Sequence, residues 1–208
     1  MGRILTGASV SLDGYIAGPG ETGFDQLFAW YNAGDVDFPS THPELQFRLT
    51  PADHRYLKGY VDELGVLVVG RRLFDLVDGW GGIHPLDRPV VVVSHSVPTE
   101  WVAAHPNAPF TFVTDGIAAA IERARAIAGD KDVGVTAGRI ASQCLELGLI
   151  DEVWFDLVPV LLGGGVRFFD ELPSAPIVLD AASAFEGARV THLRYIVSGR
   201  RLSAVADA

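Results

Sequence analysis

Three short segments of the sequence place glycine, arginine and hydroxyl side chains directly after runs of valine. The first is Gly70-Arg71-Arg72, the second is Ser94-His95, and the third is Ala137-Gly138-Arg139-Ile140. Glycine lets a backbone approach a ligand closely, and arginine side chains and backbone N–H groups bind phosphate oxygens. In a chain with a net charge of −10, an anion must be bound by such local groups. The three segments together predict a ligand with several phosphates, such as a dinucleotide.

We call these three segments corners, because each follows the end of a predicted strand. The residues before them have the composition of buried strands. Val66–Val69, Val90–Val93 and Val133–Thr136 each lead into one of them. Near-continuous valine, without alternation with polar residues, is typical of parallel strands that helices cover on both faces. Because the carboxyl ends of parallel strands meet at one edge of a sheet, we expect the three corners to converge on one ligand.

The other elements predict an α/β fold. Ile4–Val10 has the pattern of an opening strand, and a helix begins after Thr50, whose side chain can cap it, and ends at Gly65. A further strand, Phe110–Val113, precedes a helix that Asp115 can cap, whereas residues 19–49 show no sustained period and read as a partly helical surface excursion. The last third of the chain predicts strands that join the same sheet in antiparallel orientation: Glu152–Val160, Ile177–Leu179 and Arg189–Val197.

Length and composition restrict the class of protein. The 208 residues suit one domain over residues 1–208. No basic run supports a nucleic-acid partner, and no apolar stretch is long enough to span a membrane, so we expect neither partner. Cys144 is the only cysteine, which excludes an intramolecular disulfide and favours a reducing, cytoplasmic location. No carboxylate stands at metal-ligand spacing from His84 or His95, so no metal site is expected.

Five segments spread over nearly the whole chain carry a family resemblance. They are Ser11-Leu12-Asp13-Gly14-Tyr15-Ile16-Ala17, Val69-Gly70-Arg71-Arg72, Val92-Val93-Ser94-His95, Gly138-Arg139-Ile140-Ala141-Ser142-Gln143, and the stretch 148–169 with its Gly163-Gly164-Gly165 run. In these segments the sequence resembles the dihydrofolate-reductase-like family, most closely its bacterial riboflavin-type reductase branch. Two positions depart from the family pattern, since Leu73 stands where threonine is usual and Ala137 stands where a second glycine is usual.

The resemblance implies the dihydrofolate-reductase-like fold, a mostly parallel sheet flanked by helices with antiparallel C-terminal strands. It implies an NADPH-dependent reductase of a small heterocycle, with reduction of 5-amino-6-(5-phosphoribosylamino)uracil in riboflavin biosynthesis as the candidate reaction. Asp13 would be the catalytic carboxylate nearest the substrate, and Gly164 and Arg167 would also contact it. Without a ligand, Asp13-Gly14 reads as a turn and Arg167 as a surface arginine. The cofactor would contact the three corners: Gly70, Arg71, Arg72, Ser94, His95, Ala137, Gly138, Arg139 and Ile140.

Two alternatives stay open at this point. The first is a dihydrofolate reductase proper, which is disfavoured because the first long helix offers no clear acid and Asp25 is the only candidate. The second is a cofactor-binding or oligomerising protein without catalytic activity, which the residues Leu73 and Ala137 suggest. Separately, Arg189–Val197 would be an exposed sheet edge unless it were covered, which predicts a homodimer that buries this region.

Overall fold

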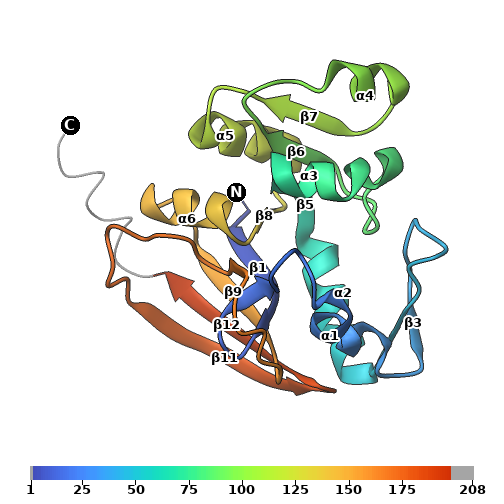
Figure 1. The fold of residues 1–208 in the computed structure, drawn as a ribbon, viewed down its shortest axis with the longest axis vertical. Coiled ribbons are helices and arrows are strands. Elements are labelled where there is room, and N and C mark those ends of the chain that lie inside the picture. Colours follow the sequence, from blue (N-terminus) through green and yellow to red (C-terminus); the bar gives the residue numbers. More distant parts are fainter. Residues whose placement is uncertain (1, 198–208) are drawn as a thin grey trace.

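The computed structural model describes residues 2–197 of the protein, and its centre is one eight-stranded sheet in the order β11-β12-β9-β1-β8-β5-β6-β7 (Figure 1). β12 (Val190–Val197) runs antiparallel to β9, and β11 (Leu179–Gly187) runs antiparallel to β12. The mixed, mostly parallel sheet confirms the predicted fold class. The parallel strands are β1 (Ile4–Ser11), β5 (Leu64–Gly70), β6 (Val90–Val93), β7 (Phe110–Val113), β8 (Asp132–Thr136) and β9 (Glu152–Val158).

Helices cover both faces of this sheet, as the valine runs predict. Val66 and Val68 of β5 belong to the buried cluster with α5 (Ile117–Ala128) and α6 (Arg139–Glu146). Leu67 and Val69, on the opposite face of β5, belong to the cluster beside α3 (Arg71–Leu76). The remaining long helix is α2 (Pro51–Glu63), which contributes to a third cluster, and the short α4 (Thr99–Ala104) packs Trp101 against Phe74 of α3.

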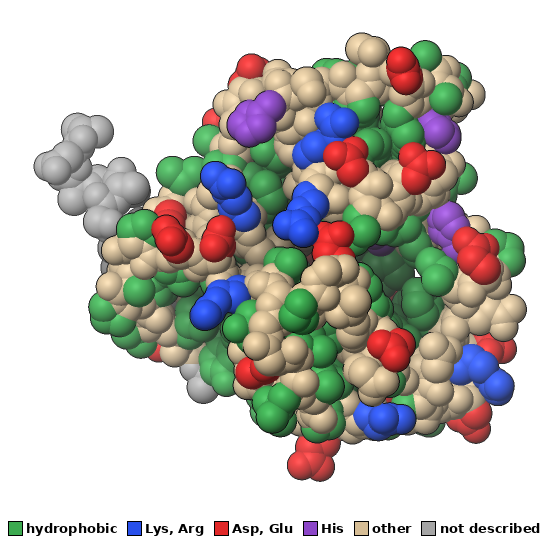
Figure 2. Space-filling view, in the orientation of Figure 1, with side chains coloured by type: hydrophobic (Ala, Val, Ile, Leu, Met, Phe, Trp, Pro, Cys, Tyr) green, Lys and Arg blue, Asp and Glu red, His purple; other side chains and the backbone are tan. Residues whose placement is uncertain are grey.

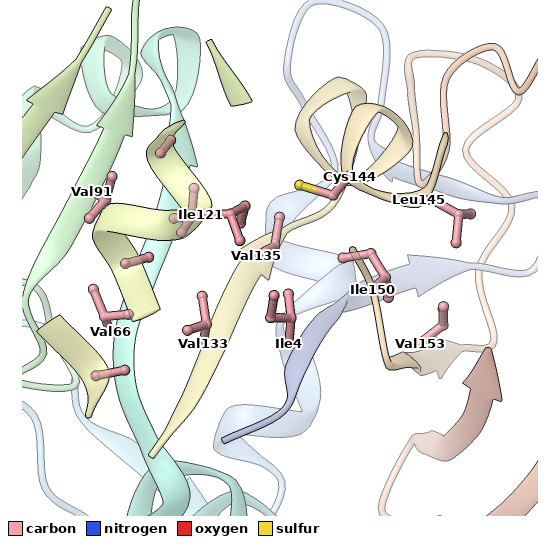
Figure 3. Packing of buried hydrophobic residues seen from close by; sticks show 14 of the residues in the cluster. Ile4, Val66, Val91, Ile121, Val133, Val135, Cys144, Leu145, Ile150 and Val153 are labelled. Atoms are coloured by element: carbon pink, nitrogen blue, oxygen red, sulfur yellow. The ribbon is translucent and has the colours of Figure 1, made fainter. Parts of the chain in front are cut away.

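The largest cluster fixes α5 and α6 against the central strands, and Figure 3 shows this packing from close by. Ile4, Val133 and Val135 come from β1 and β8, and they contact Ile121 of α5 and Cys144 of α6 in the same buried group. Because both helices begin at carboxyl ends of strands, this packing fixes where their N-termini lie.

Residues 12–49 contain more secondary structure than the sequence pattern indicates. They form β2 (Tyr15–Ala17), α1 (Phe24–Leu27), the 3-10 helix Ala29–Asn32, β3 (Val36–Phe38) and β4 (Phe47–Leu49). Leu27, Trp30, Phe38 and Leu49 are buried against α2. Each element is only three or four residues long, which is too short to establish a hydrophobic period. The segment is therefore a packed wall beside α2.

Two predicted helix boundaries differ in the structure: the end of α2 and the cap of α5. Thr50 caps α2 as expected, because its side chain accepts a hydrogen bond from the Asp53 N–H, but the helix ends at Glu63. Gly65 lies inside β5, where a Cβ atom would come within 2.9 Å of Ala128 and Lys131, so the close approach of α5 requires glycine there. The cap of α5 is Gly116, at φ 94°, and not Asp115, and no side chain bonds the first N–H groups of this helix.

The C-terminal strands also differ in detail from the prediction. β9 is parallel to β1, and Ile177 precedes β11, which begins at Leu179. Arg189–Val197 was expected as an exposed edge, but β12 pairs on both sides, so β11 and β7 are the edges of the sheet. Among residues 2–197, no helix is long and apolar enough to cross a membrane.

Candidate active site

A cleft of about 1850 Å³ opens at the carboxyl ends of the parallel strands and extends down the α2 face of the sheet. We call its two parts the phosphate end and the aromatic pocket. The phosphate end is lined by the corners that follow β5, β6, β7 and β8. Figure 2 shows a hollow between α3 and the β3 segment with hydrophobic side chains in its walls, whereas Lys and Arg side chains gather towards α3 and α6. The aromatic pocket is lined by Phe28, Tyr31, Phe47, Tyr56, Tyr60, Trp154 and Asp156.

The first two predicted corners are joined directly. An Arg71 guanidinium nitrogen donates to the Ser94 hydroxyl and to the Ser96 carbonyl, both at 3.2 Å. Arg71 Nε also pairs with Asp75 at 2.7 Å, so the guanidinium is fixed over the end of β6. His95 is exposed and lines the same part of the cleft.

The third corner meets the first. A Cβ atom on Gly70 would lie 3.1 Å from the Ile140 side chain, so the two corners touch here and a larger residue would have to displace Ile140. Gly138 has φ 87°, in the region that favours glycine, and its N–H donates to the Phe168 carbonyl at 2.7 Å, which holds the corner against the segment after β10 (Val166–Arg167). Arg139 is exposed, lines the cleft and forms no ion pair among the described residues. The expected convergence of the three corners on one cleft is therefore observed.

A fourth corner, which the sequence interpretation missed, lies at the end of β7. Thr114, Gly116 and Ile117 line the phosphate end, and Gly116 begins α5 without a side-chain cap. The N-termini of α5 and α6 thus both offer uncapped N–H groups to the cleft. The assignment of Asp115 as a cap concealed this corner, although the glycine that follows it was a usable signal.

An ion pair joins the two sides of the phosphate end. Arg72 Nε donates to Glu21 Oε1 at 2.6 Å, which connects α3 to the turn after β2. Glu21 has φ 60°, in the left-handed region that non-glycine residues seldom adopt. The pair places one carboxylate at the mouth of the phosphate end, and Glu146, Asp170 and Glu171 also line the cleft on the side of α6.

Aromatic rings form the walls of the second part of the cleft. The ring centroids of Tyr31 and Phe47 are 5.0 Å apart, and those of Tyr60 and Trp154 are 5.4 Å apart. Burial, and the nearby charge of Asp156, raise the pKa of the Tyr31 and Tyr60 hydroxyls, so both remain neutral. The pocket therefore has the shape and polarity to accept a flat ring system.

Asp156 lies among these rings and is anchored through one of its two oxygens. The Tyr56 hydroxyl donates to Asp156 Oδ1 at 2.7 Å, and His192 Nδ1 contacts the same oxygen at 2.7 Å. The other ring nitrogen of His192 lies 3.1 Å from Asp53 Oδ1, and Asp53 is fully buried. Among residues 2–197, no group donates to Asp156 Oδ2, and the side chain keeps 14% of its surface exposed. The open oxygen is thus available to a ligand in the pocket.

The sequence of the chain matches the model of the RibD C-terminal domain family over residues 4–193. The chain belongs to this family. No protein with a curated description matches it in sequence.

Solved structures show the dihydrofolate-reductase-like fold of this family as well. A putative riboflavin biosynthesis protein from Shewanella sp. PV-4 has a TM-score of 0.71 and 24% identity, over 95% of this chain and 99% of that one. RibD from Acinetobacter baumannii has a TM-score of 0.63 and 14% identity. The match covers 95% of this chain and 58% of the Acinetobacter chain. A pyrimidine reductase-like protein from Corynebacterium diphtheriae has a TM-score of 0.60 and 12% identity, over 95% and 92% of the two chains.

The predicted substrate residues of this RibD C-terminal domain lie apart from the aromatic pocket. Asp13 does not line the cleft. Its carboxylate accepts the Ser11 hydroxyl at 2.5 Å and the N–H groups of Leu162 and Gly163 at 3.1 and 2.7 Å, which lowers the pKa of Asp13. The placement favours the turn-forming interpretation of Asp13, which braces two loops.

The glycine run contributes only its C-terminal side to the cleft. Gly164 does not line the cleft, whereas Gly165 does. Arg167 of β10 (Val166–Arg167) lines the cleft beside Gly138, and its guanidinium lies 5.7 Å from the Tyr15 ring centroid. Arg167 thus belongs to the phosphate end, with Arg71, Arg72 and Arg139.

The two departures from the family pattern both line the cleft. Leu73 packs against the apolar cluster beside α3, and Ala137 packs against the cluster beneath α6. Neither side chain can donate a hydrogen bond to a phosphate. Thr114 and the N-terminus of α5 supply donors at the same end of the cleft.

His84, considered above only as a metal ligand, is a half-buried, neutral histidine at the wall of the cleft. Burial, with smaller effects from the charges of His42 and Arg88, lowers its pKa to about 3. Its Nδ1 accepts the Leu86 N–H at 3.1 Å, and its ring packs edge-on against Trp80. No group of three His, Cys, Asp or Glu residues in the described part of the chain could hold a metal ion.

The low pKa of His84 predicts a component of acid sensitivity. Below its ordinary pKa of 6.5, the unfolded chain binds a proton that the folded protein does not bind. The stability from this group is therefore complete at neutral pH and falls by about 1.4 kcal/mol per pH unit as the pH drops towards 4. Urea unfolding of wild type and His84→Asn, in which the amide oxygen can still accept the Leu86 N–H, should show a weaker pH dependence in the variant. If the unfolding free energies of the two proteins fell equally with decreasing pH, the lowered pKa of His84 would be contradicted.

Proposed function

We propose that the protein is an NADPH-dependent reductase that transfers a hydride to a small heterocycle, with a role in riboflavin biosynthesis. One observation carries the proposal: four strand-end corners with arginines and uncapped helix N-termini line the same cleft as an aromatic pocket with an open carboxylate. Family membership supports a reductase, and the name of the Shewanella protein supports the pathway. The candidate substrate from the sequence is 5-amino-6-(5-phosphoribosylamino)uracil.

The residues at the phosphate end fit NADPH. Gly138 leaves room for a diphosphate at the N-terminus of α6, and Arg139 is available to pair with it. Arg71, which the Ser94 hydroxyl orients, offers a guanidinium to a ribose phosphate. These contacts would favour NADPH over NADH, because only NADPH carries the additional phosphate.

Bound NADPH would supply the hydride, and the protein would orient the substrate and handle the proton. Tyr31, Tyr56, Tyr60 and Trp154 would hold a flat ring and exclude water from it. Asp156, in place of Asp13, is the carboxylate that faces this ring. Its open Oδ2 can accept an N–H from the substrate, or deliver a proton to the reduced atom when it is protonated.

Arg139 tests the proposed function with a single substitution. Arg139→Ala should weaken NADPH binding about 10- to 100-fold, because a charge-assisted hydrogen bond contributes about 1.5–3 kcal/mol. Fluorescence quenching or calorimetry on the purified protein would measure the change, with Arg123→Ala, on the exposed part of α5, as the matched control. Wild-type protein that fails to bind millimolar NADPH would reject the reductase and leave the non-catalytic alternative.

Substitution of Glu21 should have the opposite effect on NADPH affinity from substitution of Arg139. Its carboxylate repels the phosphates and holds Arg72, so Glu21→Gln should bind NADPH several-fold more tightly at low salt, and the gain should shrink as salt screens the charges. The same titration at two salt concentrations would measure it. An affinity that is unchanged or weaker would show that Glu21 does not oppose the cofactor.

The homodimer stays a proposal as well, with a changed interface. Because β12 is internal to the sheet, a second copy would cover β11 and the loops around it. Sedimentation at micromolar concentration would decide between a dimer and a monomer.

A further inference from the structure

We propose that His42 is a positioning residue for the substrate. With a proton on each ring nitrogen, it ties the segment between β3 and β4 to the segment 83–86, and the two segments together form the wall of the cleft beside the aromatic pocket. The inference rests on the proposed reductase function, because it concerns how that site holds its substrate. It adds a pH-dependent element to the site.

The two segments line the cleft from opposite sides. We call residues 41–46 the strap, and its residues 44–46 line the cleft just before Phe47, which belongs to the aromatic pocket. Residues 84–86 line the cleft after the 3-10 helix Asp78–Gly82. Figure 1 shows the chain after β3 reaching towards the segment that follows α3. Phe47 and Leu86 pack against the same buried cluster, so both segments rest on one part of the core.

Hydrogen bonds from the first two residues of the strap join it to the opposite segment. The Thr41 N–H donates to the Pro85 carbonyl, and the Thr41 hydroxyl donates to the His84 carbonyl, both at 3.0 Å. His42 Nε2 lies 2.7 Å from the Ile83 carbonyl oxygen. These contacts are next to the residues of the strap that line the cleft, so they set where that wall lies.

The surroundings of the His42 ring require a proton on both nitrogens. Nε2 faces the Ile83 carbonyl, and Nδ1 lies 2.9 Å from Glu44 Oε1. A carbonyl and a carboxylate only accept, whereas a neutral imidazole has a single N–H to donate. The hydrogen bond to Ile83, and then the bond to Glu44, raise the pKa of His42 above its ordinary value of 6.5. The side chain is 21% exposed, so the ring can exchange its proton with solvent.

The other charged groups nearby leave His42 as the switchable cation of this wall. On β3, on β4 and between α3 and β6, the titratable and charged residues are Asp37, Arg48, Asp78, His84, Asp87 and Arg88. Burial lowers the pKa of His84 to about 3, so His84 is uncharged and does not repel His42. The Arg88 guanidinium donates to the carbonyls of Val61 and Leu64, and Arg48 pairs with Asp37 at 3.7 Å. The charge of His42 therefore meets the carboxylate of Glu44.

The tie should weaken as the pH rises. Because the pKa of His42 is raised in the folded protein, the stabilisation from its proton is complete below pH 6.5 and is lost as the pH passes through the folded-state pKa. One ring nitrogen then faces an oxygen with a lone pair, and the strap loses a contact. A substrate that binds against residues 44–46 must then order them, which lowers its affinity.

Amide hydrogen exchange on the ligand-free protein tests the tie. We expect the protection factor of the Thr41 N–H to fall several-fold between about pH 6 and about pH 9 in the wild type. His42→Gln, whose side-chain N–H₂ can still donate to the Ile83 carbonyl, should remove this pH dependence. His42→Ala should lower the protection at both pH values. A wild-type protection factor that stays constant over this range would overturn the proposal.

The partner of the ring gives a second variant. Glu44→Gln keeps an oxygen that can accept the Nδ1 proton but removes the charge that helps to raise the pKa of His42. The midpoint of the change in Thr41 protection should therefore move to a lower pH. A merely structural loop contact would not move with the charge of residue 44, so an unchanged midpoint would count against the role of the His42 proton.

Calorimetry with the candidate substrate tests the effect on the site. The probe is 5-amino-6-(5-phosphoribosylamino)uracil, titrated into protein saturated with NADP⁺. His42→Ala should weaken its binding about three- to tenfold at about pH 6, with NADPH affinity unchanged, and His42→Gln should restore most of the loss. His105→Gln is the matched control, because the His105 ring also contacts a backbone carbonyl, that of Trp101 at 2.9 Å, but does not line the cleft. Equal binding by wild type and His42→Ala would overturn the positioning role.

The outcome is separable from the fate of the proposed function, because the exchange experiment needs neither cofactor nor substrate. A pH-dependent strap in a protein that binds no NADPH would reject the reductase and keep the tie. Binding of NADPH with constant Thr41 protection would keep the reductase and reject the tie. A wild type that binds NADPH but not the probe at millimolar concentration would reject the positioning role of His42 for this substrate.

Discussion

Asp156→Asn is expected to lower kcat/KM for the reductase reaction by about 100-fold or more, while the affinity for NADPH stays near that of wild type. General acid–base catalysis by a positioned side chain contributes about 10²–10⁴-fold, and an amide can neither deliver a proton nor accept one at Oδ2. The substitution is nearly isosteric, and the asparagine side-chain oxygen can still accept hydrogen bonds from Tyr56 and His192. The phosphate end is formed by other strands, so the cofactor contacts should persist.

Steady-state kinetics with NADPH and an aminopyrimidine substrate would measure this effect. Asp13→Asn is the matched comparison, because Asp13 does not line the cleft. Its carboxylate accepts hydrogen bonds from the Ser11 hydroxyl and from the N–H groups of Leu162 and Gly163. We expect a much smaller loss of kcat/KM in this variant. The reverse order of the two effects would restore the role that the sequence alone suggests for Asp13 and would contradict the role of Asp156.

Asp53→Ala is expected to give the largest loss of stability of any change near the site, about 3–5 kcal/mol. Asp53 is fully buried, and its carboxylate accepts the Thr50 hydroxyl at 2.6 Å and the Ala188 N–H at 3.2 Å, and it contacts His192 at 3.1 Å. Removal of the carboxylate would leave His192 Nε2, the Thr50 hydroxyl and the Ala188 N–H without this acceptor. Chemical denaturation would measure the change in unfolding free energy.

The same residue also positions Asp156 through His192. Asp53→Asn keeps the size of the side chain, so it should cost less stability than the alanine variant. Its carboxamide presents a neutral oxygen or an N–H to His192, which changes the proton balance of the chain that holds Asp156. We therefore expect a shifted pH profile of kcat with little change in NADPH affinity. A variant that loses stability but keeps the wild-type pH profile would show that Asp53 has only a structural role.

The phosphate end could be predicted from sequence because its signals are local. A valine run followed by glycine and arginine indicates a strand, a turn and a helix start within ten residues, and the geometry of a parallel sheet brings such corners together. Gly70, Ser94 and Gly138 lie where this reasoning places them. The corner at Gly116 was missed because an Asp next to a glycine has two readings as a helix start.

The aromatic pocket could not be predicted because its residues are brought together only by the tertiary fold. His192 lies 36 residues from Asp156 and 139 residues from Asp53 along the chain. Each looks unremarkable locally: Asp53 reads as a first-turn acid of α2, and Asp156 reads as a polar residue between Phe155 and Leu157. The one available signal was a charged residue between apolar residues in the middle of a strand, because such a group is seldom buried without a functional or structural partner.

The most direct test of the account is a crystal structure of the protein with NADPH bound. We predict the diphosphate at Gly138 and Arg139, the ribose phosphate at Arg71 and Ser94, and the nicotinamide at the junction of the phosphate end with the aromatic pocket, on the side of Asp156. A cofactor bound outside this cleft, or one whose nicotinamide points away from the pocket, would contradict the central claim that the strand-end corners and Asp156 form one active site.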